Sequence, residues 1–364
     1  MKTDDFNFEL PPGLIAQYPP ERRGESRLLV LDRATDRITH SRVGEIASFI
    51  EPGTLMVMND SRVRKARVYG RALDSGSKVE FLLLARKGAD VWEASCTKLR
   101  KQREGRRYDF GEGVVGEIVG RGPVDESEGQ PDAGHREPIL AESTRSIRFS
   151  PPIDETWLEA HGHIPLPPYI RREDAPTDAE RYQTIFAREV GSAAAPTAGL
   201  HFTDAIIDRL RERGIEMATL TLHVGLGTFL PVRAENLDEH VMHEEWWSLS
   251  AETAAAVNRA KTEGRPILAI GTTSVRTLES AWRQADETGP SGLRAGEGRT
   301  RIFIKPGYEW KLVDRLFTNF HTPRSTLLML VAAFAGRDRI LSAYASAIEE
   351  GYRFFSYGDA MLIR

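Results

Sequence analysis

The sequence predicts an α/β protein, in which a mostly parallel mixed sheet has flanking helices and a small β-rich segment is inserted into it. Two observations predict this class. From Pro151 onward, helical and strand-like patterns alternate, which is typical of a largely parallel sheet covered by helices. Between about Arg62 and Ser150 no helical period is found, and short strand-like pieces at regular spacing indicate a small barrel or sandwich.

Strand-like runs of one style flank the β-rich segment, so we expect it to be an insertion. The first is residues 27–31 (RLLVL), and the second is residues 54–58 (TLMVM). Turn signals such as DSGS at 74–77 separate the expected strands of the insertion. Residues 121–138, which are mostly polar, are expected to form a mobile loop. The expected strands of the insertion are residues 66–71, 79–85, 91–96, 114–119 and 147–149.

After the insertion the pattern predicts a series of helices and strands. Thr203 is placed to cap a helix over residues 204–213, and Gly214 is placed to close it. The other expected helices are residues 252–263, 274–284, 325–335 and 339–350. The expected strands are residues 217–224, 266–270, 302–304, 316–320 and 352–356.

The composition limits the classes of function. A net charge of −4 provides no global basic field for nucleic acid, so a polyanion must meet a local patch. Cys96 is the only cysteine, which excludes an intramolecular disulfide and a thiolate zinc cluster. No secretory signal is evident, and no run approaches the ~20 apolar residues of a membrane helix. We expect a cytoplasmic protein that binds no metal, and a monomer because no dimer helix is evident.

Residues 191–203 (GSAAAPTAGLHFT) form the most informative stretch. Small residues such as Gly199 let the backbone approach another group closely. Thr197 adds a hydroxyl, and His201 adds a ring that titrates near neutral pH. Either a ligand pocket or a tight packing loop with a buried histidine explains this pattern.

Two further histidines stand at the ends of expected strands, where ligands gather in α/β sheets. His223 precedes the glycines of residues 219–229 (TLTLHVGLGTF), and His321 follows LFTNF. For any one of these histidines a structural role is an equal alternative to catalysis. His240 and His243 are three positions apart, but the residues that follow lack metal-site spacing.

Residues 269–278 (AIGTTSVRTL) run from a strand through Gly271 into a helix. The hydroxyls of Thr272, Thr273 and Ser274, with free amides at a helix start, are suited to a carboxylate or phosphate. Arg276 favours an anion site, because a cation near a helix start is unfavourable without one. An ordinary helix cap is the alternative.

Other candidates lie outside these stretches. Tyr182 and Gln183 (in ERYQT) are able to stack on and hydrogen-bond a purine-like ring, or simply to start a helix. Asp60 and Arg62 follow the TLMVM strand and would line the mouth between the two expected domains. Basic residues gather at 62–71 and 98–107, where they form either a solvated face or a phosphate-binding surface. Walker A, HExxH and GxSxG motifs are absent.

The same motifs carry a family resemblance. GSAAAPTAGLHFT, LTLHVGLGTF, GTTSVRTLES, TNFHTPRSTLLMLVAAFAG and YRFFSYGDAMLI resemble those of the S-adenosylmethionine:tRNA ribosyltransferase-isomerases of queuosine biosynthesis. LIAQYP, SRLLVLDR, NDSRV, HIPLPPYI and ERYQT fit the same pattern. The resemblance runs from about Phe6 to the C-terminus. The sequence departs from the family pattern mainly in the insertion. There, KLRKQREGRR stands where the family often has a Pro-Gly-Lys/Arg turn, and residues 121–138 look expanded.

The resemblance implies both fold and activity. It implies a discontinuous α/β catalytic domain over residues 1–61 and 150–364, with a small β-barrel domain over 62–149. The family transfers and isomerises the ribosyl group of S-adenosylmethionine onto 7-aminomethyl-7-deazaguanine at the tRNA wobble position. The product is epoxyqueuosine-tRNA, and adenine and methionine are released. S-adenosylmethionine is therefore the expected co-substrate, and tRNA carrying that anticodon base is the expected partner.

This chemistry requires a positioned base, because the sulfonium of the donor acidifies the adjacent ribose C5′ protons. We hypothesise that His201 or His223 is that base, with His321 as the third choice. Thr272, Thr273, Ser274 and Arg276 would hold the methionine carboxylate or a tRNA phosphate, and Tyr182 and Gln183 would face adenine or the deazaguanine. An S-adenosylmethionine-dependent RNA methyltransferase and a non-catalytic tRNA-binding module are the competing classes. The first would need a Gly-rich turn after an early strand, which is not found.

Overall fold

The chain divides into two compact units in the computed structural model, which describes residues 1–122, 144–225, 232, 234–285 and 291–364. One unit comprises residues 1–63, 167–173 and 180–364, and the other comprises residues 64–166 and 174–179. The loop expected at 121–138 lies outside the described residues apart from its first two positions. We describe each unit by itself.

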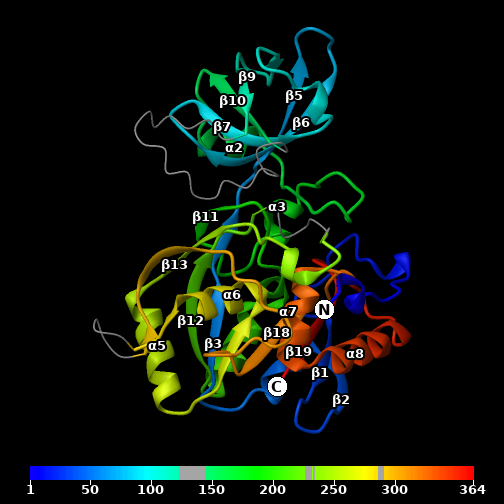
Figure 1. The fold of residues 1–364 in the computed structure, drawn as a ribbon, viewed down its shortest axis with the longest axis vertical. Coiled ribbons are helices and arrows are strands. Elements are labelled where there is room, and N and C mark those ends of the chain that lie inside the picture. Colours follow the sequence, from blue (N-terminus) through cyan, green and yellow to red (C-terminus); the bar gives the residue numbers. More distant parts are fainter. Residues whose placement is uncertain (123–143, 226–231, 233, 286–290) are drawn as a thin grey trace. The chain divides into compact units, whose positions relative to one another are not determined.

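The larger unit is built on a mixed sheet, which has nine strands within the described residues (Figure 1). The four neighbours β12, β3, β14 and β18 are all parallel to one another. Antiparallel pairs flank this block on both sides, and β1 pairs in parallel with β19. The strand order is β17 (Gly296–Thr300), β13 (Glu245–Leu249), β12 (Glu216–Leu222), β3 (Leu55–Asn59), β14 (Ile267–Ile270), β18 (Arg315–Asn319), β19 (Ala360–Ile363), β1 (Arg27–Leu31) and β2 (Ile38–Arg42).

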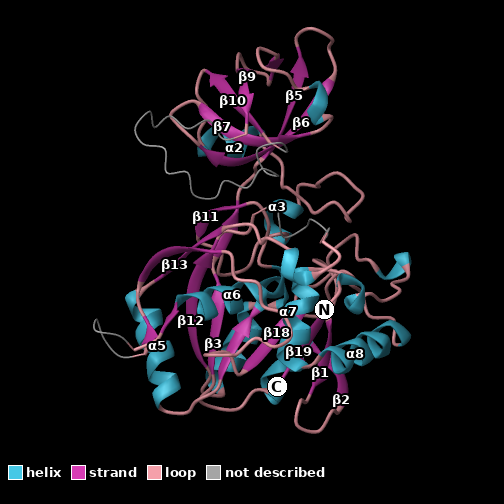
Figure 2. Ribbon diagram, in the orientation of Figure 1, coloured by secondary structure: helices cyan, strands magenta, loops and turns pink. Residues whose placement is uncertain are grey.

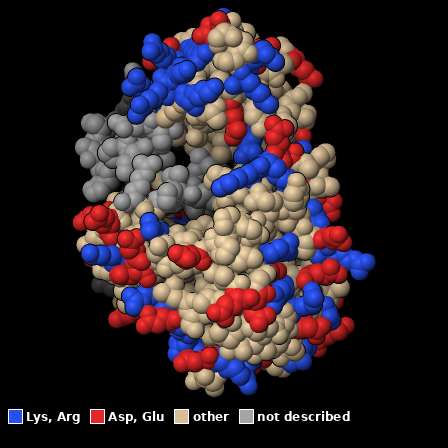
Figure 3. Space-filling view, turned by 90° about the vertical axis from the view of Figure 1, so that its right-hand side faces the viewer, with Lys and Arg blue, Asp and Glu red and all other residues tan. Residues whose placement is uncertain are grey.

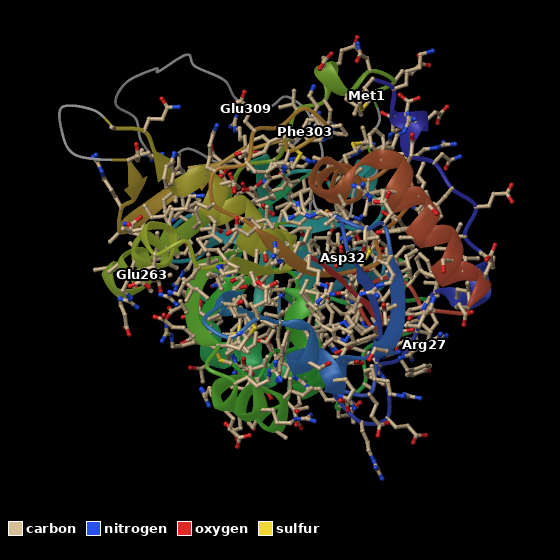
Figure 4. The ribbon with its side chains drawn as sticks, turned by 90° about the horizontal axis from the view of Figure 1, so that it is seen from below. Met1, Arg27, Asp32, Glu263, Phe303 and Glu309 are labelled. Carbon is tan, nitrogen blue, oxygen red and sulfur yellow. The ribbon has the colours of Figure 1, made fainter. Side chains whose placement is uncertain are left out.

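The central strands of the sheet are buried on both faces, which explains their unbroken apolar runs. In β1, Leu29 and Leu31 pack into one core while Leu28 and Val30 pack into another on the opposite face. Arg27 and Asp32, labelled in Figure 4, bound this strand. The first face is covered by α5 (Ala251–Thr262), α6 (Gly271–Ala281), α7 (Thr326–Ala335) and α8 (Arg337–Glu349). The second is covered by η3 (Val43–Phe49) and α4 (Asp204–Glu212), and Thr203 caps α4 as predicted.

The smaller unit contains a closed antiparallel barrel with the strand order β10-β7-β6-β5-β8-β9 (Figure 2). Its interior is apolar and includes the buried Phe81, Ile118 and Phe149, with Leu158 of α2 (Glu155–His161) packed against them. The strands are β5 (Arg67–Ala72), β6 (Lys78–Arg86), β7 (Val91–Cys96), β8 (Arg107–Asp109), β9 (Val115–Arg121) and β10 (Arg145–Ser150). The predicted α/β class with a mixed sheet and a β-barrel is thus confirmed.

Short elements complete the described chain. β4 (Ser61–Val63) and β11 (Glu189–Ser192) form a parallel pair in the larger unit, and β15 (Trp282–Arg283) pairs with β16 (Gly292–Leu293). The short helices are η1 (Thr3–Phe6), η2 (Pro12–Leu14), η4 (Leu99–Lys101), α3 (Asp178–Arg181), η5 (Thr197–His201) and η7 (Leu237–Glu239).

Two strand predictions are wrong. Residues 302–304 form no strand, and the strand of this region is β17. The glycines of β17 give no apolar alternation in the sequence. Gly298 lacks a side chain because the Trp247 ring occupies the space beside it. Residues 352–356 are also not a strand. Their aromatic rings, including Phe354, pack on Phe320 and Tyr344, and the strand follows at β19.

Candidate active site

A cavity of about 230 Å³ lies in the larger unit, where the motifs singled out from the sequence meet. Strands β14 and β18 run in parallel, with Ile270 opposite Phe317, so the segments that follow them reach the same edge of the sheet. Ligands bind at this edge in α/β proteins. The lining residues are Tyr169, 194–198, Val224, 271–273, 318–323, Leu327 and 355–356.

The start of α6 forms one wall of the cavity. Gly271 has a φ of +83°, which lets β14 turn directly into the helix, and so the helix begins three residues earlier than predicted. Thr272 and Thr273 therefore lie in the first turn and line the cavity. No side chain caps this helix, and the first amides of a helix have no partner within it. Ser274 instead donates its hydroxyl hydrogen to the Ile270 carbonyl, 2.8 Å away.

Arg276 is buried one turn further along α6 and does not line the cavity. Its Nη1 forms a buried ion pair with Glu245, whose other oxygen accepts a 3.3 Å hydrogen bond from the Gly225 amide. Burial lowers the pKa of Arg276 to about 10. The predicted unfavourable cation near the helix start is thus balanced by a carboxylate of the protein itself.

His321 is the one predicted histidine that lines the cavity. Its Nε2 lies 2.9 Å from the hydroxyl oxygen of Thr318, and its backbone amide donates to the hydroxyl of Tyr344. The side chain is 8% exposed, and burial lowers its pKa to about 3. The imidazole is therefore neutral at ordinary pH and held in a fixed orientation.

His201 lies behind the cavity wall and not in it. Its Nε2 accepts a 3.1 Å hydrogen bond from Nδ2 of Asn319, and its ring meets the Phe317 ring edge-on. Burial, followed by the positive charges of Arg353 and Arg23, lowers the pKa of His201 to about 3. Because His201 is not among the lining residues and its Nε2 is already bonded to Asn319, its position suits a hydrogen-bond acceptor better than a base that acts in the cavity.

His223 also lies outside the lining residues. Its ring stacks on Trp246, with the centroids 5.0 Å apart. A Cβ at Gly191, which has a φ of +153°, would lie only 2.7 Å from Nε2 of His223. This close approach explains one glycine of the small-residue stretch by packing.

The small-residue stretch contributes both to the cavity and to the core. Thr197 and the alanines around it line the cavity. Gly199, by contrast, is buried where an added Cβ would lie 2.7 Å from Thr184 and 2.8 Å from Phe186. The two alternatives that the sequence left open are therefore both present in one segment.

The remaining predicted residues are placed away from the cavity lining. Both polar atoms of the Gln183 side chain bond to the backbone of Val63, and the buried Tyr182 ring meets Tyr357 edge-on. Asp60 is 2% exposed and is bonded by Thr221 and Arg188, but desolvation still raises its pKa. Arg62 is exposed.

Several lining residues were not predicted as site residues, although they lie within motifs that the sequence analysis describes. Asn319 stands in TNFHTP, Tyr169 in HIPLPPYI, and Phe355 and Ser356 in YRFFSYGD. The hydroxyls of Tyr169 and Ser356 are 2.5 Å apart, and the Tyr169 and Phe355 rings are 4.7 Å apart. The signals available in the sequence were the amide of Asn319, close to His321 at the end of a strand, and the aromatic rings of Tyr169 and Phe355.

The barrel unit presents a basic surface of its own (Figure 3). Arg71 of β5 lies opposite Lys78 of β6 and Asp109 of β8, and Arg107 stands two positions before that aspartate on the same strand. These three basic side chains are exposed. The segment between β7 and β8, which includes η4, adds the exposed basic residues Lys98, Arg100, Lys101 and Arg103.

Two kinds of feature are absent from the part of the chain that the structure describes. These residues contain no cluster of three or more His, Cys, Asp or Glu side chains arranged to hold a metal ion. Within the same ranges, no helix is long and apolar enough to cross a membrane.

Comparisons with known proteins cover the whole chain. A family model described as "Queuosine biosynthesis protein" matches residues 3–363. Proteins named S-adenosylmethionine:tRNA ribosyltransferase-isomerase from Treponema denticola, Syntrophotalea carbinolica and Moorella thermoacetica are 47%, 50% and 48% identical, each over 100% of both chains. The crystal structure of an S-adenosylmethionine tRNA ribosyltransferase from Thermotoga maritima has a TM-score of 0.54 at 36% identity. It covers 99% of this chain and 100% of its own.

Proposed function

The chain belongs to the queuosine biosynthesis protein family, and we propose that it is an S-adenosylmethionine:tRNA ribosyltransferase-isomerase. It transfers and isomerises the ribosyl group of S-adenosylmethionine onto 7-aminomethyl-7-deazaguanine at the tRNA wobble position. Epoxyqueuosine-tRNA forms, and adenine and methionine are released. The observation that carries this proposal is that motifs from six separate parts of the chain line one cavity at the strand ends.

In this proposal the methionyl end of the donor binds at the start of α6. A carboxylate there meets the positive end of the helix dipole and the hydroxyls of Thr272 and Thr273. Thr197 borders the same cavity from the opposite segment. Ser274 and Arg276 act indirectly in this arrangement, since both are engaged by protein groups behind the wall.

Proton abstraction next to the sulfonium requires a base at the cavity wall. Of the three predicted histidines, His321 is supported by its position among the lining residues. Its neutral imidazole is free to accept a proton, and bound anionic groups of the substrates would raise its lowered pKa. The mostly apolar walls, which include Phe320 and Phe355, would limit quenching of a carbanion by water.

The tRNA partner requires a basic contact surface, because the chain as a whole is acidic. The exposed Arg71, Lys78 and Arg107 of the barrel supply such a surface. Anticodon loops are already partly open, so the wobble base is accessible for extrusion into a pocket. Contacts of Tyr182, Gln183, Asp60 and Arg62 with substrate, action in the cytoplasm and a monomeric state stay predictions.

One incubation tests the proposal. The protein is mixed with S-adenosylmethionine and tRNA that carries 7-aminomethyl-7-deazaguanine, and the same tRNA with guanine at that position is the control. Free adenine and methionine, formed with the first tRNA alone, are the expected products. S-adenosylhomocysteine would instead identify a methyltransferase, and the absence of turnover with retained tRNA binding would identify a binding module.

A further inference from the structure

Asn319 has a buried side-chain amide, and its nitrogen and its oxygen have different surroundings. Its Nδ2 donates 3.1 Å hydrogen bonds to Nε2 of His201 and to the backbone carbonyl of Phe355. Its Oδ1 is buried and has no hydrogen-bond partner among the described residues. The side chain is 2% exposed, and the residue lines the cavity. A buried carbonyl oxygen without a donor costs free energy, and a ligand in the cavity that brings an N–H group would satisfy it.

The amide is held in this orientation. Turning it by 180° would place Oδ1 against the Phe355 carbonyl, which is only an acceptor. With Nδ2 held on this side, Nε2 of a neutral His201 ring is the acceptor of its second hydrogen bond and carries no proton. Burial keeps this ring neutral at ordinary pH by lowering its pKa. These two hydrogen bonds therefore fix which end of the amide is left unpaired, and on this cavity-lining residue it is the carbonyl oxygen and not an N–H group.

The start of α6 follows β14, which is the strand next to β18 and Asn319. β14 leads into Gly271 while β18 ends at Asn319, and both residues line the same cavity. Thr273, in the first turn of α6, also has a buried hydroxyl oxygen without a hydrogen-bond partner in the described chain. An anion-binding helix start and an unpaired acceptor thus stand side by side.

We propose that Asn319 Oδ1 accepts a hydrogen bond from the α-ammonium of S-adenosylmethionine while the first turn of α6 binds its carboxylate, with His201 as the positioning residue that fixes the amide. This inference rests on the proposed function. An α-amino acid carries an anion and an N–H donor on one carbon, which matches the paired sites. The adenine amino group has no neighbouring anion and does not match them.

Binding measurements on the full-length protein test this inference. Calorimetry compares S-adenosylmethionine with its analogue that lacks the α-amino group, for the wild-type protein and for Asn319→Leu. We expect the wild type to bind the donor about tenfold or more tightly than the analogue, and Asn319→Leu to lose most of that preference. Asn258→Leu is the matched control, because Asn258 bonds Leu293 outside the cavity.

The role of His201 is tested by a pair of variants. His201→Gln keeps an acceptor near the position of Nε2 and should retain the preference for the amino group, whereas His201→Phe keeps the ring and should lose it. A general loss of packing would lower the affinity for both ligands equally.

The outcomes separate the two proposals. Equal affinity of the wild-type protein for the donor and the deaminated analogue overturns the inference without any variant, and so does an unchanged preference in Asn319→Leu or His201→Phe. Release of adenine from precursor tRNA by the wild type is measured alongside. If adenine is released but the preference is absent, only the inference fails; if neither donor binding nor adenine release occurs, the proposed function fails.

Discussion

Nε2 of His321 and the hydroxyl oxygen of Thr318 lie 2.9 Å apart in the wall of the cavity. Because this contact orients the ring, we expect His321→Gln to slow adenine release in a single turnover by about 100-fold or more, as for the loss of a general base. His223→Gln, whose ring lies outside the lining, should reduce the rate less. A folded His321→Gln protein with a near-normal rate would exclude His321 as the base.

Acid should destabilise the protein through its two buried histidines. Burial lowers the pKa of both His201 and His321 from 6.5 to about 3, so the unfolded state binds more protons between these values. The stabilisation is complete above pH 6.5 and is lost as the pH falls toward 3. At pH 5 each histidine should cost about 2 kcal/mol of the free energy of unfolding. Urea unfolding at pH 7 and pH 5 measures this, and His201→Gln should show a flatter pH dependence than the wild type.

The ion pair between Arg276 and Glu245 should behave as a buried structural pair. Arg276→Met removes the positive charge that pairs with the buried carboxylate of Glu245 and should lower the free energy of unfolding by about 3–5 kcal/mol. The double variant Arg276→Met/Glu245→Met should recover much of this stability. Urea unfolding of the single and double variants gives the coupling energy, and strictly additive effects would contradict the pairing.

Gly271 should matter for donor binding as well as for stability. An alanine there would adopt a strained positive φ and place its Cβ 3.3 Å from that of Ala198, so we expect a decrease of about 1–2 kcal/mol in stability and weaker donor binding. Gly264→Ala is the control, since its φ is +66° and its Cβ would meet nothing within 4 Å. Calorimetry should show a change in donor affinity for Gly271→Ala alone.

The basic face of the barrel should determine how tRNA affinity depends on salt. Replacing Arg71, Lys78 and Arg107 by alanine should reduce the slope of log affinity against log salt by roughly 0.7–0.9 for each tRNA phosphate that these side chains neutralise in the wild type. The same change at the exposed Arg211, Arg213 and Lys261 of the other unit is the control. Equal slopes for the two triple variants would show that tRNA does not bind to this face.

The fold was predictable where side-chain burial follows the backbone period. Runs such as RLLVL are buried on both faces of the sheet, and the structure confirms a strand there. β17 was missed because Gly298 makes room for the Trp247 ring and so carries no apolar signal. Residues 352–356 have a strand-like pattern because of their aromatic residues. The rings of these residues pack in a core cluster, and the segment does not pair as a strand of the sheet.

The site was predictable as a set of motifs but less so as individual residues. Thr197, Thr272, Thr273 and His321 were chosen from sequence and line the cavity. Asn319 was not chosen, because only the structure shows that its amide nitrogen is used by His201 and Phe355 while its oxygen is left. For Gln183 the structure shows a packing role that the sequence did not indicate, since both polar atoms of its side chain bond to the backbone of Val63, and its contact with substrate stays a prediction.

The position of β19 has a consequence for biosynthesis. It joins β18 to β1, and the amide of Arg27 at the start of β1 donates to the carboxylate of Asp359, 332 positions later. Among the described strands, β1 and β2 join the rest of the sheet through β19 alone, so they lack this pairing until the ribosome has released that distant segment. The barrel, whose strands all lie within residues 67–150, is able to fold while translation continues. The nascent larger unit must therefore wait with an open sheet edge, so its yield should depend on protection against aggregation during that interval.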